Sequence, residues 1–267
     1  MTMKNSRSFL SLLATSLLTT LLVGCALPPS GKTPDTLRVG YSPHYPPVSF
    51  AIGGQFAGLE ADFARDLAAE LHCQPVLVPL AREELEPALA RGEVDIVMSG
   101  RTITPARALK VDFCDSYTDN PLVALVRAED AGVFKSAEEI CGTRAPIGVL
   151  RGTSGELFAR RHCLNTKLVP VALRSDVPLH LTSRLYNLYI DDLAAVIDIL
   201  LNSETTLELV PIPLYEQQLA WAVAPGNDGL RTAANAILAE WRQNGHLDAL
   251  LDRWLTYRRA LAAPPAR

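Results

Sequence analysis

Short apolar runs alternate with helical patterns from Thr36 onwards, and this alternation constrains the fold more than any other feature of the chain. Thr36–Tyr41, Val76–Pro79 and Val94–Met98 have the length and composition of strands. The segments between them, Leu59–Leu71 and Glu83–Arg91, carry apolar residues at helical spacing. Strand–helix–strand–helix–strand order predicts an α/β unit with a parallel sheet.

A second unit of the same kind begins at the apolar strand Pro146–Leu150. It continues with a helix over Glu156–Cys163, a strand over Val169–Leu173 and a helical segment over Val177–Leu185. In parallel sheets, ligands bind beyond the carboxyl ends of the strands. We therefore expect the loops that follow the strands of each unit to share one rim.

The stretch Gly100–Arg107, which follows the third strand, admits two interpretations. Thr104 and Pro105 suit the N-cap and first position of a helix, so Arg107 falls in the first turn, where a cation is unfavourable. An anion held by Arg107 and the Thr102 hydroxyl would resolve this conflict. The alternative is a plain strand–turn–helix with an exposed arginine.

A second anion-friendly loop is Gly152-Thr153-Ser154, which offers two hydroxyls and free N–H groups before a helix. Most such loops are simple turns. Asp192 ends the strand Asn187–Ile190 and begins the helix Leu193–Leu201, where an aspartate is most often only an N-cap.

The N-terminus carries an export signal. Lys4 and Arg7 precede the apolar run Phe9–Val23, which is too short for a good membrane span. The run ends in Leu22-Val23-Gly24-Cys25, which resembles a bacterial lipobox; an ordinary signal peptide with a chance cysteine is the alternative. The resemblance implies a signal peptide over 1–24, lipidation of Cys25, a tether over 25–35 and a lipoprotein anchored to a membrane in the periplasm or at the cell surface.

Composition excludes some classes of function. A net charge of −4 with 6% aromatic residues gives no case for nucleic-acid binding. The five histidines lack metal-ligand spacing, so we expect no metal and no cofactor. Of the five cysteines, four remain beyond Cys25, and they allow three disulfide pairings.

Most of the chain, about residues 36–257, resembles the bacterial extracellular solute-binding proteins of family 3, which serve amino-acid ABC importers. The pieces that carry the resemblance are Leu37–Gly40 with Tyr45–Pro47, Gly58–Ala64, Leu89–Val97, Gly100–Arg107, Val111–Tyr117, Gly148–Ser154, Asn244–Leu247 and Arg253-Trp254. The resemblance implies an α/β, two-lobed periplasmic-binding-protein-like fold (type II) with the ligand cleft between the lobes. Lobe 1 would comprise 36–118 plus 217–257, lobe 2 would comprise 121–213, and 258–267 would be a disordered tail.

The resemblance also implies the ligand site of a protein that captures an amino acid or similar small zwitterion for an ABC permease. Arg107 corresponds to the α-carboxylate clamp, Asp192 to the α-amino acceptor and Tyr45 to the aromatic wall. Gly100, Thr102, Thr153 and Ser154 correspond to helpers of the clamp. Ser42 belongs to the same rim, and it stands where the family often has an acidic residue, which weakens the case for a cationic ligand side chain. We expect a monomer.

Cys141 lies just before the strand Pro146–Leu150, and Cys163 ends the helix that returns antiparallel to that strand. Both therefore lie at the base of lobe 2, away from the cleft. We predict a disulfide between them.

An enzyme on the same fold is the main alternative. Cyclohexadienyl dehydratases resemble this family and share the ending Trp254-Leu255-Thr256-Tyr257-Arg258. Such an enzyme needs a proton donor near the leaving group, and Glu156 is the nearest candidate. A glutamate in the first turn of a helix is normally structural, so we expect a binding protein rather than an enzyme. A sensor role has no supporting effector segment.

Overall fold

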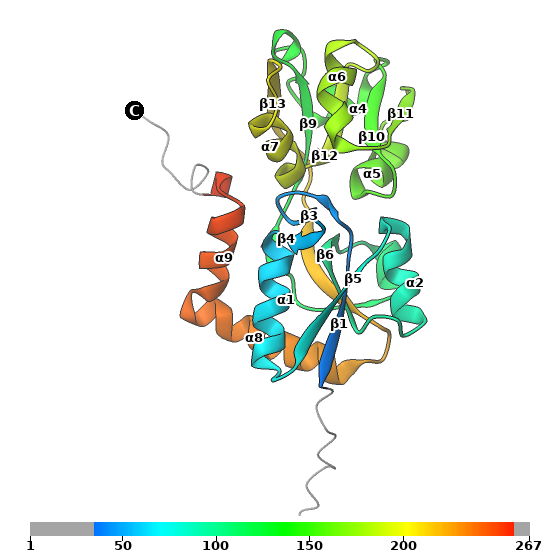
Figure 1. The fold of residues 1–267 in the computed structure, drawn as a ribbon. Coiled ribbons are helices and arrows are strands. Elements are labelled where there is room, and N and C mark those ends of the chain that lie inside the picture. The colour runs from blue at the N-terminus through cyan, green and yellow to red at the C-terminus, as the bar shows by residue number, and fades with distance from the viewer. Residues whose placement is uncertain (1–34, 259–267) are drawn as a thin grey trace, which may run out of the picture. The chain divides into compact units, whose positions relative to one another are not determined.

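The computed structural model describes residues 35–258 (Figure 1). Within this range the chain forms two α/β lobes, each built on its own sheet, so the predicted two-lobed fold is confirmed. The predicted signal peptide (1–24), Cys25 and nearly all of the predicted tether (25–35) lie outside the described residues. Of the predicted tail (258–267) only Arg258 is described, and its guanidinium pairs with the carboxylate of Asp248 at 3.1 Å.

The sheet of lobe 1 has the strand order β5-β1-β6-β14-β7, with β8 beside β14. Strands β1, β5 and β6 are parallel, and β14 returns antiparallel to β6. Its strands are β1 (Thr36–Tyr41), β5 (Gln74–Pro79), β6 (Ile96–Thr102), β7 (Asp112–Phe113), β8 (Thr118–Asp119) and β14 (Gln218–Val223). A small antiparallel sheet beside it comprises β2 (His44–Tyr45), β3 (Ser49–Ile52) and β4 (Gln55–Ala57).

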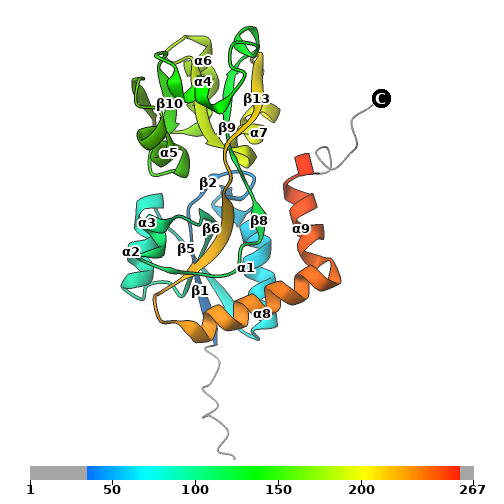
Figure 2. The same ribbon diagram turned by 180° about the vertical axis from the view of Figure 1, so that it is seen from behind.

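Helices cover both faces of this sheet because its central strands are apolar on both sides. Along β6, Ile96 and Met98 pack into the cluster under helix α1, whereas Val97 packs into the cluster under helix α2. Helices α8 and α9 lie beside α1 (Figure 2). The helices of lobe 1 are α1 (Leu59–Glu70), α2 (Leu85–Ala90), α3 (Pro105–Ala108), α8 (Asp228–Asn244) and α9 (His246–Trp254).

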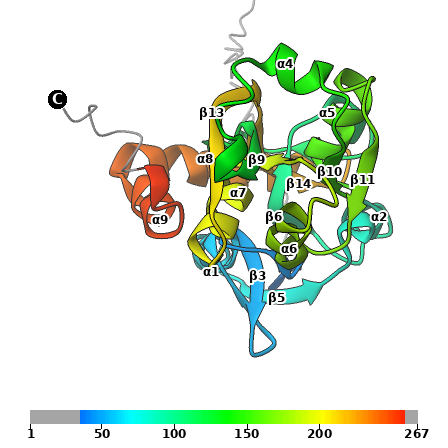
Figure 3. The same ribbon diagram turned by 90° about the horizontal axis from the view of Figure 1, so that it is seen from above.

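The sheet of lobe 2 has the order β11-β10-β12-β9-β13. Its strands are β9 (Leu122–Arg127), β10 (Ile147–Leu150), β11 (Leu168–Val171), β12 (Leu188–Asp192) and β13 (Leu207–Tyr215). Helices α4 (Ala137–Gly142) and α5 (Ser154–His162) cover one face, and α6 (Val177–Thr182) and α7 (Leu193–Leu201) cover the other (Figure 3). Successive side chains of β9 point to opposite faces of the sheet, so Ala124 packs under α5 and Leu125 packs under α7.

The chain passes between the two sheets twice, at residues 120–121 and 216–217. The two passages run side by side, since β8 pairs with β14 below them and β9 pairs with β13 above them. The Asn120 N–H donates to the carbonyl of Gln217 at 2.9 Å and joins the two passages directly. They therefore form one hinge rather than two independent connections.

Two predicted helices are shorter in the structure. The helix expected over Glu83–Arg91 begins only at Leu85, because Arg82–Glu84 form a 3-10 turn. Helix α6 ends before the expected Leu185 because Arg184 adopts a positive φ of 59°, a left-handed conformation that caps helix C-termini. No helix in residues 35–258 is long and apolar enough to cross a membrane.

Candidate functional site

Arg107 lies on α3, in the first turn that the sequence predicted. Thr104 is the N-cap, its hydroxyl accepts the Arg107 N–H at 3.3 Å, and Pro105 occupies the first helical position. The side chain is buried and spans both lobes. One guanidinium nitrogen donates to the Thr102 carbonyl at 2.9 Å, and the other terminal nitrogen donates to the Gly152 carbonyl at 3.2 Å. The alternative interpretation, an exposed arginine at a plain helix start, is therefore wrong.

The charge of Arg107 is poorly compensated. Burial lowers the pKa of Arg107 to about 9, and the neighbouring guanidinium groups of Arg101 and Arg82 act in the same direction. Glu86 is the carboxylate that opposes this effect, and it stands 3.8 Å away while also pairing with Arg101. An anion beside Arg107 would relieve the repulsion among these arginines.

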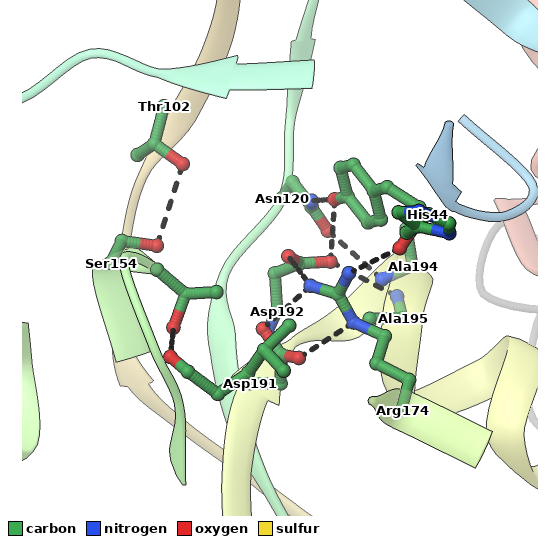
Figure 4. A network of polar contacts seen from close by, with 12 residues as sticks. His44, Thr102, Asn120, Ser154, Arg174, Asp191, Asp192, Ala194 and Ala195 are labelled. Atoms are coloured by element: carbon green, nitrogen blue, oxygen red, sulfur yellow. Dashed lines mark hydrogen bonds and ion pairs between the residues drawn. The ribbon is translucent and has the colours of Figure 1, made fainter. Parts of the chain in front are cut away.

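Asp192 and Tyr45, predicted as the α-amino acceptor and the aromatic wall, meet directly across the two lobes. The Tyr45 hydroxyl donates to Asp192 Oδ1 at 2.7 Å, and burial followed by the Asp192 charge raises the pKa of Tyr45, so the hydroxyl keeps its proton. Asp192 Oδ1 also accepts the Ala195 N–H at 3.0 Å, which makes it the N-cap of α7 (Figure 4). Asn120 donates to the Tyr45 hydroxyl at 2.9 Å, and its side-chain oxygen accepts the Ala194 N–H at 3.0 Å. Asn120, a residue of the hinge, thus joins Tyr45 of lobe 1 to the start of α7 in lobe 2.

Arg174 and Asp191 form a buried ion pair that the sequence analysis missed. The guanidinium contacts both oxygens of Asp191, at 2.8 and 3.2 Å, and its third nitrogen donates to the His44 carbonyl of lobe 1 at 3.2 Å (Figure 4). The guanidinium carbon lies 4.5 Å from the centre of the Tyr45 ring, within cation–π range. Burial alone would raise the pKa of Asp191, but Arg174 holds it below its usual value.

The predicted hydroxyls of the two lobes take different roles. Thr102 and Ser154 face each other across the lobes with their oxygens 3.4 Å apart (Figure 4). Thr153 is the N-cap of α5, because its hydroxyl accepts the Glu156 N–H at 3.2 Å and donates to the Leu150 carbonyl at 2.7 Å. The Glu156 carboxylate accepts the Gly152 N–H and pairs with an arginine of α5, which holds the pKa of Glu156 below its usual value against the effect of burial. It is therefore poorly suited to the proton-donor role that the dehydratase alternative needs.

Gly100 acts through packing rather than through its own hydrogen bond to a ligand. Its N–H donates to the buried Glu60 carboxylate at 2.6 Å, so this donor is already used. Its φ of 59° and its contact with Tyr45, whose ring a Cβ would overlap, explain why only glycine fits. Glu60 also accepts from the Tyr117 hydroxyl and the Trp221 indole, at 2.7 and 3.0 Å. Burial nevertheless outweighs these three hydrogen bonds and raises the pKa of Glu60 to about 7.

A cavity of about 520 Å³ lies between the lobes, and we call it the interlobe cleft. Its walls are the loops that follow the carboxyl ends of β1, β5, β10 and β11, as expected for parallel sheets. Its volume is in the range of small-molecule sites. The lining includes Ser42, His44, Arg82, Arg151 and Arg174.

A second cavity, of about 310 Å³, shares Arg82 with the interlobe cleft and is lined by Arg101, Arg107 and Gly152 as well. Ser154 lines a third, smaller cavity, of about 100 Å³. Among the predicted site residues, Ser42, Arg107 and Ser154 thus line cavities. Tyr45 and Asp192 lie together at the hinge.

Arg82 and Arg174 could have been found from the sequence. Each lies in a loop three residues after the end of a parallel strand, β5 and β11 respectively, and the same argument identified the loops after the other strands. Neither residue belongs to a motif: Arg82 directly precedes a predicted helix, and Arg174 lies between a predicted strand and a predicted helical segment.

The four described cysteines, Cys73, Cys114, Cys141 and Cys163, are free thiols in the structure, so the predicted disulfide is not formed there. The two thiols nevertheless lie close enough to affect each other's pKa. Burial, with the Cys141 thiol beside it, raises the pKa of Cys163 to about 12, so both groups remain thiols at neutral pH. Over residues 35–258, no group of three or more histidine, cysteine or acidic side chains could hold a metal ion.

Comparisons with known proteins agree with this architecture. The sequence profile of the bacterial extracellular solute-binding proteins, family 3, matches residues 37–257. The L-cystine-binding protein TcyJ of Escherichia coli (strain K12) is 31% identical over 228 residues, which is 84% of each chain.

Two solved structures illustrate the likeness of fold. One is a putative ABC transporter binding component from Wolinella succinogenes complexed with lysine, with a TM-score of 0.78, 26% identity and coverage of 83% of this chain and 96% of that one. The other is the ancestral amino acid-binding protein AncCDT-1, a precursor of cyclohexadienyl dehydratase, with a TM-score of 0.75, 30% identity and coverage of 82% and 95%. In this comparison the dehydratase is a descendant of an ancestral binding protein. The chain belongs to the bacterial extracellular solute-binding proteins, family 3, and it is a binding protein of that family rather than an enzyme.

Proposed function

We propose that this protein captures an amino acid, or a similar small zwitterion, outside the cytoplasm and delivers it to an ABC permease. The observation that carries the proposal is Arg107, a buried and poorly compensated cation that contacts a carbonyl of each lobe. A ligand carboxylate bound there would contact both lobes at once and would favour their closure.

The remaining roles follow from chemistry. Thr102 and Ser154 offer one hydroxyl from each lobe beside the carboxylate. Asp192 is the acceptor for the ammonium group, because Asp191 already neutralises Arg174 and leaves the Asp192 charge in excess. Tyr45 forms the aromatic wall. Gly100 contributes by allowing Tyr45 to approach, and Thr153 by capping the helix that carries Ser154.

The location of the protein is part of the proposal. The apolar run before Cys25 and its lipobox-like ending support export, cleavage after residue 24 and lipidation of Cys25, with the tether holding a monomeric binding domain at a membrane surface. An oxidising compartment favours a disulfide between the neighbouring thiols of Cys141 and Cys163.

Calorimetric titration of the chain from residue 26 with the common amino acids tests the proposal. We expect at least one of them to bind, and Arg107→Ala to weaken binding about a hundredfold or more, because a buried carboxylate loses its partner. Arg107→Lys keeps the charge but cannot make two parallel hydrogen bonds to the carboxylate, so its affinity should lie between those of the wild type and Arg107→Ala. Arg144→Ala is the matched control, since Arg144 is exposed before the amino end of β10, away from the cleft. Wild-type affinity in Arg107→Ala would reject the clamp.

A further inference from the structure

Five arginines line the two adjoining cavities, and Arg151 among them is exposed. The other four are buried or half-buried, and we call them the arginine cluster: Arg82, Arg101, Arg107 and Arg174. Arg82 and Arg174 line the interlobe cleft, and Arg82, Arg101 and Arg107 line the second cavity. Their charges act on one another. After burial, Arg174 and Arg101 lower the pKa of Arg82 to about 10, and Arg101 and Arg82 lower that of Arg107.

Two members of the cluster are already neutralised. Arg101 contacts Glu86 through two of its nitrogens, one of them at 3.1 Å, and both side chains are largely buried. Arg174 contacts both oxygens of Asp191. Each of these pairs has its own carboxylate and has no need of a ligand.

Arg82 is different, because it has no hydrogen bond or ion pair with any other residue of the described chain. It lies on the 3-10 turn after β5, its stem packs beside Gly152 of lobe 2, and its guanidinium carbon is 5.8 Å from the centre of the Tyr45 ring. A half-buried guanidinium in this setting presents five donors to the cavities that it lines.

The charges of the site that no other residue neutralises indicate which charges a complementary ligand carries. Arg82 and Arg107 remain as two cations, and Asp192 remains as one anion. The remaining charged residues of the rim, Glu83, Lys110 and Arg151, are exposed, and their charges are screened by water. The complementary ligand has two anionic groups and one cationic group.

We propose that the ligand is an amino acid with an anionic side chain and that Arg82 is the residue that selects it. The inference rests on the proposed amino-acid-binding function. In it, Arg107 binds the α-carboxylate, Asp192 binds the ammonium group and Arg82 binds the side-chain anion. An arginine side chain or a lysine side chain at the same place would be repelled by Arg82, and a neutral side chain would leave it unpaired.

Pairs of ligands that differ only in the charge of the side chain test whether that charge contributes to binding. The chain from residue 26 would be titrated calorimetrically with L-glutamate and L-glutamine, and with L-aspartate and L-asparagine, because each pair differs in charge at nearly constant shape. L-Cystine and L-lysine would serve as neutral and cationic probes. We expect one acid to bind about tenfold or more tightly than its amide, as is typical of a charge-assisted hydrogen bond.

Variants then assign the preference to Arg82. Arg82→Gln should bring the ratio of acid to amide affinity close to one while the amide still binds, and Arg82→Lys should restore part of the preference. Arg144→Gln removes the same charge far from the cleft and should leave the ratio unchanged. Circular dichroism establishes that each variant is folded.

The outcomes separate the two claims. Tighter binding of a neutral or cationic amino acid overturns this inference and leaves the proposed function standing, as does an unchanged ratio in Arg82→Gln. Failure of every amino acid to bind rejects the proposed function and the inference with it.

Discussion

Glu60 should make the stability of lobe 1 depend on pH in the direction opposite to that of most carboxylates. Its folded pKa of about 7 lies above the ordinary value of 4.5, so the folded state binds a proton that the unfolded chain has already released. The stabilisation is therefore complete below pH 4.5 and is lost as the pH rises through 7. At about 1.4 kcal/mol for each tenfold difference in proton affinity, Glu60 makes the free energy of unfolding about 2.5 kcal/mol greater at pH 5 than at pH 8.

Urea denaturation at pH 5, 6, 7 and 8 measures this effect, with Glu60→Gln as the informative variant. Its amide oxygen can accept from Gly100 and Tyr117, but its NH2 group would face the Trp221 indole donor, so we expect it to be less stable by about 1–3 kcal/mol. Its stability should lack the decline of about 2.5 kcal/mol expected for the wild type. Glu208→Gln, on the exposed edge of β13, should keep that decline. Equal pH profiles for wild type and Glu60→Gln would refute the reasoning.

Three further experiments test other parts of the chain. Gly100→Ala should cost about 3 kcal/mol in urea denaturation, because it adds a left-handed alanine and overlaps the Tyr45 ring, whereas Gly54→Ala, with a similar φ but open space, should cost about 1 kcal/mol. Thiol titration of denatured protein isolated from the membrane fraction of the cell should find two free thiols in the domain, at Cys73 and Cys114, with two more after reduction; four before reduction would exclude the disulfide between Cys141 and Cys163. Cys25→Ser should move the protein from the membrane fraction to the soluble fraction after cell lysis, and a protein that stays with the membrane would argue against lipidation.

Local sequence patterns were sufficient to predict most of the helices and strands and part of the site. The N-cap of Thr104 and the first-turn position of Arg107 follow from a few neighbouring residues, and the structure has both. The loops at the strand ends were identified because parallel strands place their carboxyl ends on one rim. These features depend on short-range geometry, which a sequence encodes directly.

Pairings between distant residues were not accessible in the same way. The bond between Tyr45 and Asp192 joins residues 147 positions apart, in different lobes, and it depends on how the hinge orients the two sheets. The pair between Arg174 and Asp191 is closer in sequence, but it requires a 3-10 turn after β11 that carries no distinctive pattern. A buried charge can be recognised as paired or unpaired only when its surroundings are known. The sequence could therefore place Arg82 on the rim, but it could not show that Arg82 lacks a partner.

The strand orders of the two sheets place some residues of the site close to the hinge and others far from it. Tyr45 and Asp192 bond to each other beside Asn120, at the hinge, so a rotation of one lobe barely separates them. Arg82 and Arg174 follow β5 and β11, which are edge strands three places away from the hinge strands β14 and β9. At about 4.8 Å per strand this distance is about 14 Å, so each 10° of rotation moves these arginines by roughly 2 Å relative to the opposite lobe. Small rotations would thus leave the contacts at Tyr45 and Asp192 nearly intact while they make or break contacts at Arg82, and recognition of the side chain there would depend strongly on how far the lobes have closed.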